Sequence, residues 1–256
     1  MRAAARSHSG PTREVNEDYV LVDPALGLVV VADGAGGVVT GVLAARLAAE
    51  GVSELLPRSA GDPEQRVRGT LRAVDQIVHE AASTEGANLE NLLHRIDRRG
   101  MDVLEMCRSG RGTLRGMFAS IVLAWWIDDR IVVAHAGTCR AYRVSDGAAR
   151  ALTIEHSVPG HPTIATQAVG LGTLESTVQS VPRLGAGRLL LCTDGLHATL
   201  DDAVIAELAG IRGVGEAVDT LIDRANAQGA RNNIAIAIAE ESADTSTSCR
   251  NFPAWT

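Results

Sequence analysis

The stretch Val29-Val30-Val31-Ala32-Asp33-Gly34-Ala35-Gly36-Gly37 is an apolar run that ends in a carboxylate followed by small residues. Successive β-branched residues predict a buried strand, and glycines directly after a strand allow the backbone to turn sharply and to approach a ligand closely. We therefore expect Asp33 at the end of a strand, beside accessible backbone.

Two further acidic segments are expected at strand ends. Arg13-Glu14-Val15-Asn16-Glu17-Asp18 precedes a predicted hairpin whose strands, 19–23 and 28–32, flank Pro24-Ala25-Leu26-Gly27. Far downstream, the apolar run Leu189-Leu190-Leu191-Cys192 leads to Thr193-Asp194-Gly195. Three acidic segments at strand ends predict a site for a hard divalent cation, because such ions prefer oxygen ligands.

The bulk properties exclude several classes of protein. The 256 residues carry a formal net charge of −7, which argues against a nucleic-acid partner, since such proteins present basic patches to phosphates. No run approaches the roughly 18 uncharged apolar residues of a membrane span, and the N-terminus has no signal-peptide core. The cysteines are too scattered for a zinc or dithiol site. We expect a soluble, cytoplasmic enzyme that does not bind a membrane.

The order of the predicted elements favours the α+β class. Helices are expected over 38–56, from Pro63 onwards, over 201–208 and over 213–228. A meander is expected over 117–127, 130–136 and 139–144, a strand pair over 175–181 and 187–193, and a closing strand over 233–239. The segment 83–112 is predicted to be a mobile connection, and 158–173 a loop. Strands that cluster before and after helical pairs indicate antiparallel sheets covered by helices.

Four motifs, in their order along roughly residues 7–239, resemble the metal-dependent serine/threonine protein phosphatases of the PPM type, also called type 2C, and in particular bacterial members. They are Arg13 with Asn16, Glu17 and Asp18; Asp33-Gly34-Ala35-Gly36-Gly37; Thr193-Asp194-Gly195; and Gly229-Ala230-Arg231-Asn232-Asn233-Ile234. The resemblance implies a four-layer sandwich of two antiparallel β-sheets flanked by pairs of α-helices. We expect a PPM-type domain over 1–240 and a disordered C-terminal tail over 241–256.

The resemblance also implies roles for individual residues. Asp33 would bridge two Mn²⁺ or Mg²⁺ ions. Glu17 and the Gly34 carbonyl would complete one ion site, and Asp194 and Asn232 the other. Asp18 would hold a metal-bound water, and Arg13 would clamp the phosphate of a phosphoserine or phosphothreonine protein, the product of a serine/threonine kinase.

Three departures from the family pattern leave alternatives open. Asn232 stands where the family has an Asp ligand, so one ion is expected to bind more weakly, and Thr138 replaces an Asp associated with a third ion. Met117-Phe118-Ala119-Ser120 differs from the family's Met-Gly-Thr-Thr, and the segment after His156-Ser157 is short for a flap over the site. The alternative functions are a pseudophosphatase that acts as a binding or regulatory module and, more remotely, a phosphohydrolase for small esters.

Each site residue also has a purely structural interpretation. Asp33 with Gly34 could be a plain turn, and Glu17 with Asp18 a solvated acidic pair. Arg13 could form an ion pair with these carboxylates, and Asn232 could be a turn residue. His135, within an apolar strand, is expected to be a core residue with its hydrogen bonds satisfied.

Overall fold

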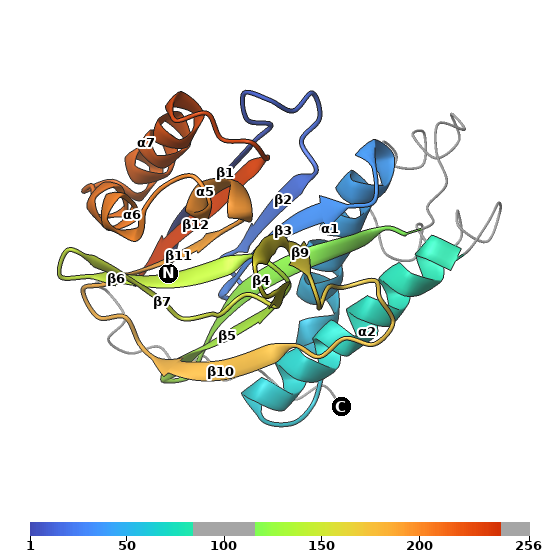
Figure 1. The fold of residues 1–256 in the computed structure, drawn as a ribbon. Helices are drawn as coiled ribbons and strands as arrows, with labels where there is room; N and C mark the ends of the chain where they lie inside the picture. Colours follow the sequence, from blue (N-terminus) through green and yellow to red (C-terminus); the bar gives the residue numbers. More distant parts are fainter. Residues whose placement is uncertain (84–115, 242–256) are drawn as a thin grey trace.

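The computed structural model describes residues 1–83 and 116–241, which form two five-stranded antiparallel sheets and a short two-stranded one (Figure 1). The β3 sheet has the strand order β10-β5-β4-β3-β2. Its strands are Thr177–Pro182, Arg130–Ala136, Phe118–Ile127, Leu28–Ala35 and Asp18–Asp23. The β11 sheet has the order β1-β12-β11-β6-β7. Its strands are Arg2–His8, Ile234–Glu240, Arg188–Cys192, Arg140–Ser145 and Ala148–Ala151.

Helices cover the outer face of each sheet, as Figure 1 shows. Helices α1 (Val38–Leu55) and α2 (Pro63–Ser83) pack on the β3 sheet, and α6 (Asp202–Ala209) and α7 (Val214–Ala227) pack on the β11 sheet. Two short helices, η1 (Leu56–Arg58) and α5 (Asp194–His197), complete the helical elements of the described residues. The predicted four-layer α+β sandwich is therefore confirmed.

The apolar run that ends at Asp33 is buried on both faces. Val30 and Ala32 belong to the core beneath α1 and α2, while Val29 and Val31 belong to the core between the two sheets. Successive side chains of a strand point to opposite faces. A strand in the middle of a layered sandwich must therefore be apolar at every position, which explains why β3 lacks the alternation of a surface strand.

Two predicted strand pairings are wrong. The third strand of the predicted meander, β6, leaves β5 and pairs with β11 and β7 in the other sheet. The predicted pair over 175–181 and 187–193 is divided in the same way, because β10 pairs with β5 and β11 pairs with β6 and β12. Part of the predicted loop over 158–173 is also a small hairpin of β8 (Ser157–Val158) and β9 (His161–Ala165).

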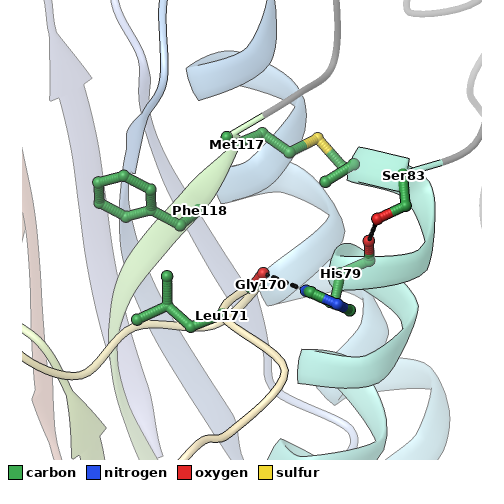
Figure 2. Close-up of a pocket in the computed structure, with 8 residues that line it drawn as sticks. His79, Ser83, Met117, Phe118, Gly170 and Leu171 are labelled. Atoms are coloured by element: carbon green, nitrogen blue, oxygen red, sulfur yellow. Dashed lines mark hydrogen bonds between the residues drawn. The ribbon is translucent and has the colours of Figure 1, made fainter.

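The segment before β10 is fixed to α2. The carboxylate of Asp75 accepts hydrogen bonds from the backbone N–H groups of Gly170, Gly172 and Leu174 at 2.7, 3.1 and 3.2 Å. One turn further along α2, His79 Nδ1 donates to the Gly170 carbonyl at 3.1 Å (Figure 2). His79 and Gly170 line one side of a cavity of about 470 Å³. None of the predicted site residues lines this cavity.

The remaining predictions about organisation fall mostly outside the described residues. The predicted mobile connection over 83–112 does so except for its first residue, and the predicted tail does so except for Glu241. That residue is held in place, since its carboxylate pairs with Arg183 and accepts the Gly185 N–H. In the residues that the structure describes, no helix is both long and apolar enough to cross a membrane.

Candidate metal centre

The strand ends deliver the predicted acidic residues to one end of the sandwich. Asp18 opens β2 and lies directly opposite Asp33 in the antiparallel register of β2 and β3. Asp194 follows β11 and is the first residue of α5. The two sheets are joined at this point, because Thr193 Oγ1 donates to Asp18 Oδ2 at 2.7 Å and accepts the Ala235 N–H at 2.9 Å. Residues from four distant segments thus share one location.

The carboxyl groups of this cluster are buried or half-buried, and the hydrogen bonds they form do not replace all of their lost contacts with water. Asp18 is only 6% exposed, and among the described residues neither its Oδ1 nor Glu17 Oε1 has a hydrogen-bond partner. Burial, together with the charges of Asp194 and Glu17, raises the pKa of Asp18 to about 7 despite the bond from Thr193. Burial and the charge of Asp18 raise the pKa of Asp33 well above its ordinary value. Carboxylates with buried, unpartnered oxygens fit a divalent cation.

Glu17 is held by its backbone and confined by two glycines. Its N–H donates to Asn233 Oδ1 at 2.9 Å, and its carbonyl accepts the Gly34 N–H at 3.2 Å. A Cβ added to Gly41 in α1 would lie 2.3 Å from Glu17 Oε1, and one added to Gly34 would lie 1.9 Å from the Gly41 carbonyl oxygen. Only glycine at 34 and 41 leaves room for this arrangement. Burial also raises the pKa of Glu17, an effect that the charge of Arg13 partly offsets.

Asn232 lies against Asp194, as the resemblance implies, but as a hydrogen-bond donor. Its Nδ2 donates to Asp194 Oδ1 at 2.8 Å. The close approach of the two segments depends on Gly195, since a Cβ there would lie 1.9 Å from the Asn233 carbonyl oxygen. Asp194 is 7% exposed, so this bond satisfies a nearly buried carboxylate. The Asp194 carboxylate therefore has a hydrogen-bond donor within the described part of the protein, which the unpartnered oxygens of Glu17 and Asp18 lack.

Arg13 lies at the exposed rim of the cluster. Its Nε donates to the Arg231 carbonyl at 3.3 Å, and neither terminal guanidinium nitrogen has a partner in the described part of the chain. Arg13 lowers the pKa of Glu17 through its charge. The side chain thus combines an anchor at Nε with free donors, the form in which arginine binds a phosphate.

One residue that holds this centre together was not predicted from the sequence. The side chain of Asn233 is buried, and its Nδ2 donates to the carbonyls of Ser9 and Val15 at 2.8 and 2.9 Å while its Oδ1 accepts the Glu17 N–H. Its position in the closing motif, directly after Asn232, was the available signal. Nothing in the residue type shows that its partners are backbone groups more than 200 positions earlier.

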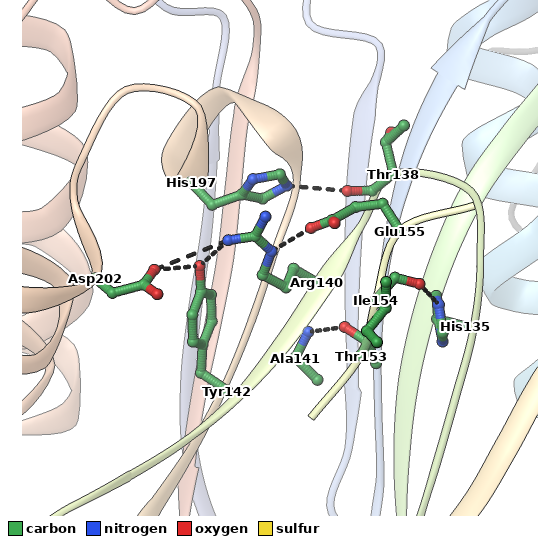
Figure 3. A network of polar contacts seen from close by, with 10 residues as sticks. All are labelled: His135, Thr138, Arg140, Ala141, Tyr142, Thr153, Ile154, Glu155, His197 and Asp202. Atoms are coloured by element: carbon green, nitrogen blue, oxygen red, sulfur yellow. Dashed lines mark hydrogen bonds and ion pairs between the residues drawn. The ribbon is translucent and has the colours of Figure 1, made fainter. Parts of the chain in front are cut away.

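Thr138, which stands where the family has the carboxylate associated with a third ion, contacts neutral groups. The Thr138 hydroxyl is 3.2 Å from Ser120 Oγ, and the Thr138 carbonyl accepts from His197 Nε2 at 2.9 Å. Next to it, Arg140 pairs with Glu155 and donates to Tyr142, whose hydroxyl donates to Asp202 at 2.9 Å (Figure 3). These bonds join β6 to α5 and α6. No carboxylate takes the place that Thr138 occupies.

The acidic side chains of this cluster do not by themselves form a complete set of metal ligands. In the described ranges 1–83 and 116–241, no three His, Cys, Asp or Glu side chains are arranged so that they could hold a metal ion as they stand. The predicted ligand set, however, also includes the Gly34 carbonyl and the Asn232 amide. The unpartnered oxygens of Glu17 and Asp18 supply further ligand atoms.

Comparison with known proteins identifies the family. The family model for protein phosphatase 2C matches residues 6–237. This chain belongs to the protein phosphatase 2C family. Serine/threonine phosphatase stp of Listeria innocua is 28% identical over 262 residues, which cover 94% of this chain and 96% of that protein.

Solved structures of family members share the fold. Serine/threonine phosphatase PstP/Ppp of Mycobacterium tuberculosis matches with a TM-score of 0.74 at 25% identity, over 93% of this chain and 97% of that one. The catalytic domain of PstP, in complex with two manganese ions, matches with a TM-score of 0.73 at 25% identity, again over 93% and 97%. This chain is therefore similar over nearly its whole length to a phosphatase whose structure contains two manganese ions.

Proposed function

We propose that this protein removes phosphate from phosphoserine and phosphothreonine residues of proteins, with Mn²⁺ or Mg²⁺ as its cofactor. The observation that carries the proposal is the cluster of Glu17, Asp18 and Asp33 carboxyl groups, in which Glu17 and Asp18 each have a buried oxygen without a partner among the described residues, in a chain of the protein phosphatase 2C family. The kinase whose products it would reverse, and its place in the cytoplasm, remain predictions.

The residues have the following roles in this proposal. Asp33 would hold both ions, with Glu17 and the Gly34 carbonyl at one and Asp194 at the other, and Asp18 would orient a water. When bound, the ions would lower the pKa of a water, so that hydroxide is available as the nucleophile at neutral pH. Arg13 binds the phosphate with its free guanidinium nitrogens and so aligns the phosphorus. No side chain forms a covalent bond to phosphate.

The test is phosphate release from a phosphothreonine peptide and from para-nitrophenyl phosphate. We expect turnover that requires added Mn²⁺ or Mg²⁺ and stops with a chelator. A phosphotyrosine peptide of the same sequence serves as the control for substrate class and should be turned over much more slowly. A folded sample without activity at saturating Mn²⁺ would contradict the proposal.

A second candidate function is favoured by the bond between Asn232 and Asp194. An amide that donates to Asp194 occupies a carboxylate oxygen and brings no negative charge of its own. If this prevents the second ion from binding, the protein is a pseudophosphatase that recognises phosphoproteins without hydrolysing them. Turnover that appears only in Asn232→Asp, with Asn232→Ala as the matched control, would establish this alternative. Equal turnover in the wild type and in Asn232→Asp would exclude it.

A further inference from the structure

A second pocket lies between α2 and the start of β10, and the proposed reaction does not use it. Its volume is about 390 Å³. It is lined by polar and charged residues from α2, from the segment that contains the β8–β9 hairpin, and from the start of β10. They are Arg68, Arg72, His156, Gln167, Glu175, Ser176 and Thr177.

The pocket carries positive charge that no described carboxylate neutralises. Arg68 and Arg72 are one helical turn apart and so project from the same side of α2. Arg68 Nη1 donates to the Ser176 carbonyl at 2.9 Å, which fixes one guanidinium over the pocket. Within the described residues neither arginine forms an ion pair. Glu175 is the one acidic lining residue, and it is exposed.

Neutral hydrogen-bonding groups complete the lining. Ser176 is 7% exposed, and its hydroxyl has no partner among the described residues. Gln167 accepts the Glu175 N–H through its side-chain oxygen, so its amide nitrogen remains a donor. His156 stacks on His135 with 4.5 Å between ring centroids, and its Nε2 lies 3.0 Å from Thr177 Oγ1. Burial lowers the pKa of His156, which makes the ring a neutral hydrogen-bonding group at pH 7.

The strand register gives the backbone separation between Thr177, which lines this pocket, and Asp33 in the carboxylate cluster. Thr177 pairs with His135, His135 with Val122, and Val122 with Val31, two residues before Asp33. Three strand spacings and two residues along a strand correspond to about 16 Å. An extended peptide of about five residues spans that distance.

We propose that the pocket around Arg68 and Arg72 binds a second phosphate group of the phosphoprotein substrate, about five residues from the phosphoserine or phosphothreonine that is hydrolysed. Two guanidinium groups with several neutral donors match the charge and the three free oxygens of a phosphorylated side chain. A single carboxylate would leave part of this charge and several donors unpaired. The inference rests on the proposed function, because it assigns that reaction a preference for multiply phosphorylated substrates.

The test compares peptides with one phosphothreonine to peptides that carry a phosphoserine in addition, placed two or five residues away on either side. We expect kcat/KM to be about tenfold higher for one of the peptides with five-residue spacing, and no gain at two residues. Arg72→Glu should abolish the gain, whereas Arg150→Glu, the same charge change at an exposed position of β7, should retain it. The ratio of doubly to singly phosphorylated peptide is taken within each variant, so that changes in overall activity cancel.

Fluorescence anisotropy of the same labelled peptides, measured with a chelator present, separates this inference from the proposed function. A wild type that fails to hydrolyse para-nitrophenyl phosphate but binds the doubly phosphorylated peptide through Arg72 would contradict only the proposed function. Equal kcat/KM for all peptides, or equal effects of Arg72→Glu and Arg150→Glu, would overturn the inference. So would binding of inorganic phosphate at Arg72 without any preference among the peptides.

Discussion

The two sides of the carboxylate cluster differ in whether their oxygens have hydrogen-bond partners within the protein. On the Glu17 side, oxygens of Glu17 and Asp18 are buried without partners, and the pKa of each group is raised by burial. On the other side, Asp194 accepts a hydrogen bond from the Asn232 amide at 2.8 Å. One side needs a cation to be stable as a charged group, while the other has an internal partner. The difference leads us to expect lower ion affinity at a motif position whose carboxylate is replaced by an amide.

The largest expected effect comes from removing the carboxylate that both sides share. Asp33→Asn should lower Mn²⁺-dependent turnover roughly a thousandfold or more, the scale seen when a member of a catalytic unit is lost. Titration calorimetry should show loss of Mn²⁺ binding on both sides. The metal-free variant should unfold at the same or a higher temperature, because burial and the charges of Asp18 and Asp194 disfavour an ionised group at this position and the amide carries no charge. Retention of one tight Mn²⁺ site would show that Asp33 is not shared.

Restoring a charge on the Asp194 side should make the two sides alike. Asn232→Asp replaces the donated hydrogen bond with a second carboxylate, so we expect affinity for the second Mn²⁺ to rise roughly tenfold or more. In the absence of metal the same variant should unfold at a lower temperature than the wild type, since two carboxylates then repel each other. Asn232→Ala, which removes the bond without adding charge, is the control. Two equally tight sites in the wild type would remove the distinction between the sides.

A methyl group added beside Glu17 should weaken metal binding on the Glu17 side and leave the Asp194 side unchanged. In Gly41→Ala the new Cβ would lie 2.3 Å from Glu17 Oε1, so the carboxylate must move. We expect about tenfold weaker Mn²⁺ binding. This is the effect typical of mutating a residue that holds a metal ligand in its orientation. Gly69→Ala on α2 is the matched control, because a Cβ there meets nothing within 4 Å. Unchanged Mn²⁺ affinity in Gly41→Ala would mean that Glu17 is not a ligand.

The smallest expected effect is a pH dependence of metal-free stability. Asp18 has a pKa of about 7 in the folded protein and an ordinary value of 3.8. The folded state therefore holds a proton that the unfolded state releases, and stability falls as pH rises from about 4 to 7. With a chelator, the unfolding temperature should be about 5 °C lower at pH 8 than at pH 5.5. Mn²⁺ should raise it more at pH 8, and Asp18→Asn should flatten the dependence.

The sequence was sufficient where neighbours along the chain determine the structure. The connection at residues 24–27 implies a hairpin, and the hairpin sets Asp18 opposite Asp33. The central position of β3 follows from a strand that is apolar at every position. Asp194 approaches these residues only because the two sheets pack against each other. Its place in the site could therefore be predicted only from the order of the family motifs.

The sequence was insufficient where strand pairing or a hydrogen-bond partner depended on residues far away in the chain. The apolar pattern of β6 or β10 suits either sheet equally well, so the strand partners could not be assigned from it. The amide of Asn232 can donate or accept, and only its surroundings decide that it donates to Asp194. Asn233 was missed for the same reason, because its three partners are backbone groups with no sequence signature.

The contacts of Asn233 also determine when the cluster can form. Glu17 is placed by a side chain that directly precedes β12, the last strand, and β1 is paired along its whole length with that strand. During synthesis the first seventeen residues therefore remain without these partners until residues 233–240 have left the ribosome. A nascent chain that stops before residue 232 lacks both the bond that places Glu17 and the partner of Asp194. Ion binding would thus report that the chain has been made and folded through β12.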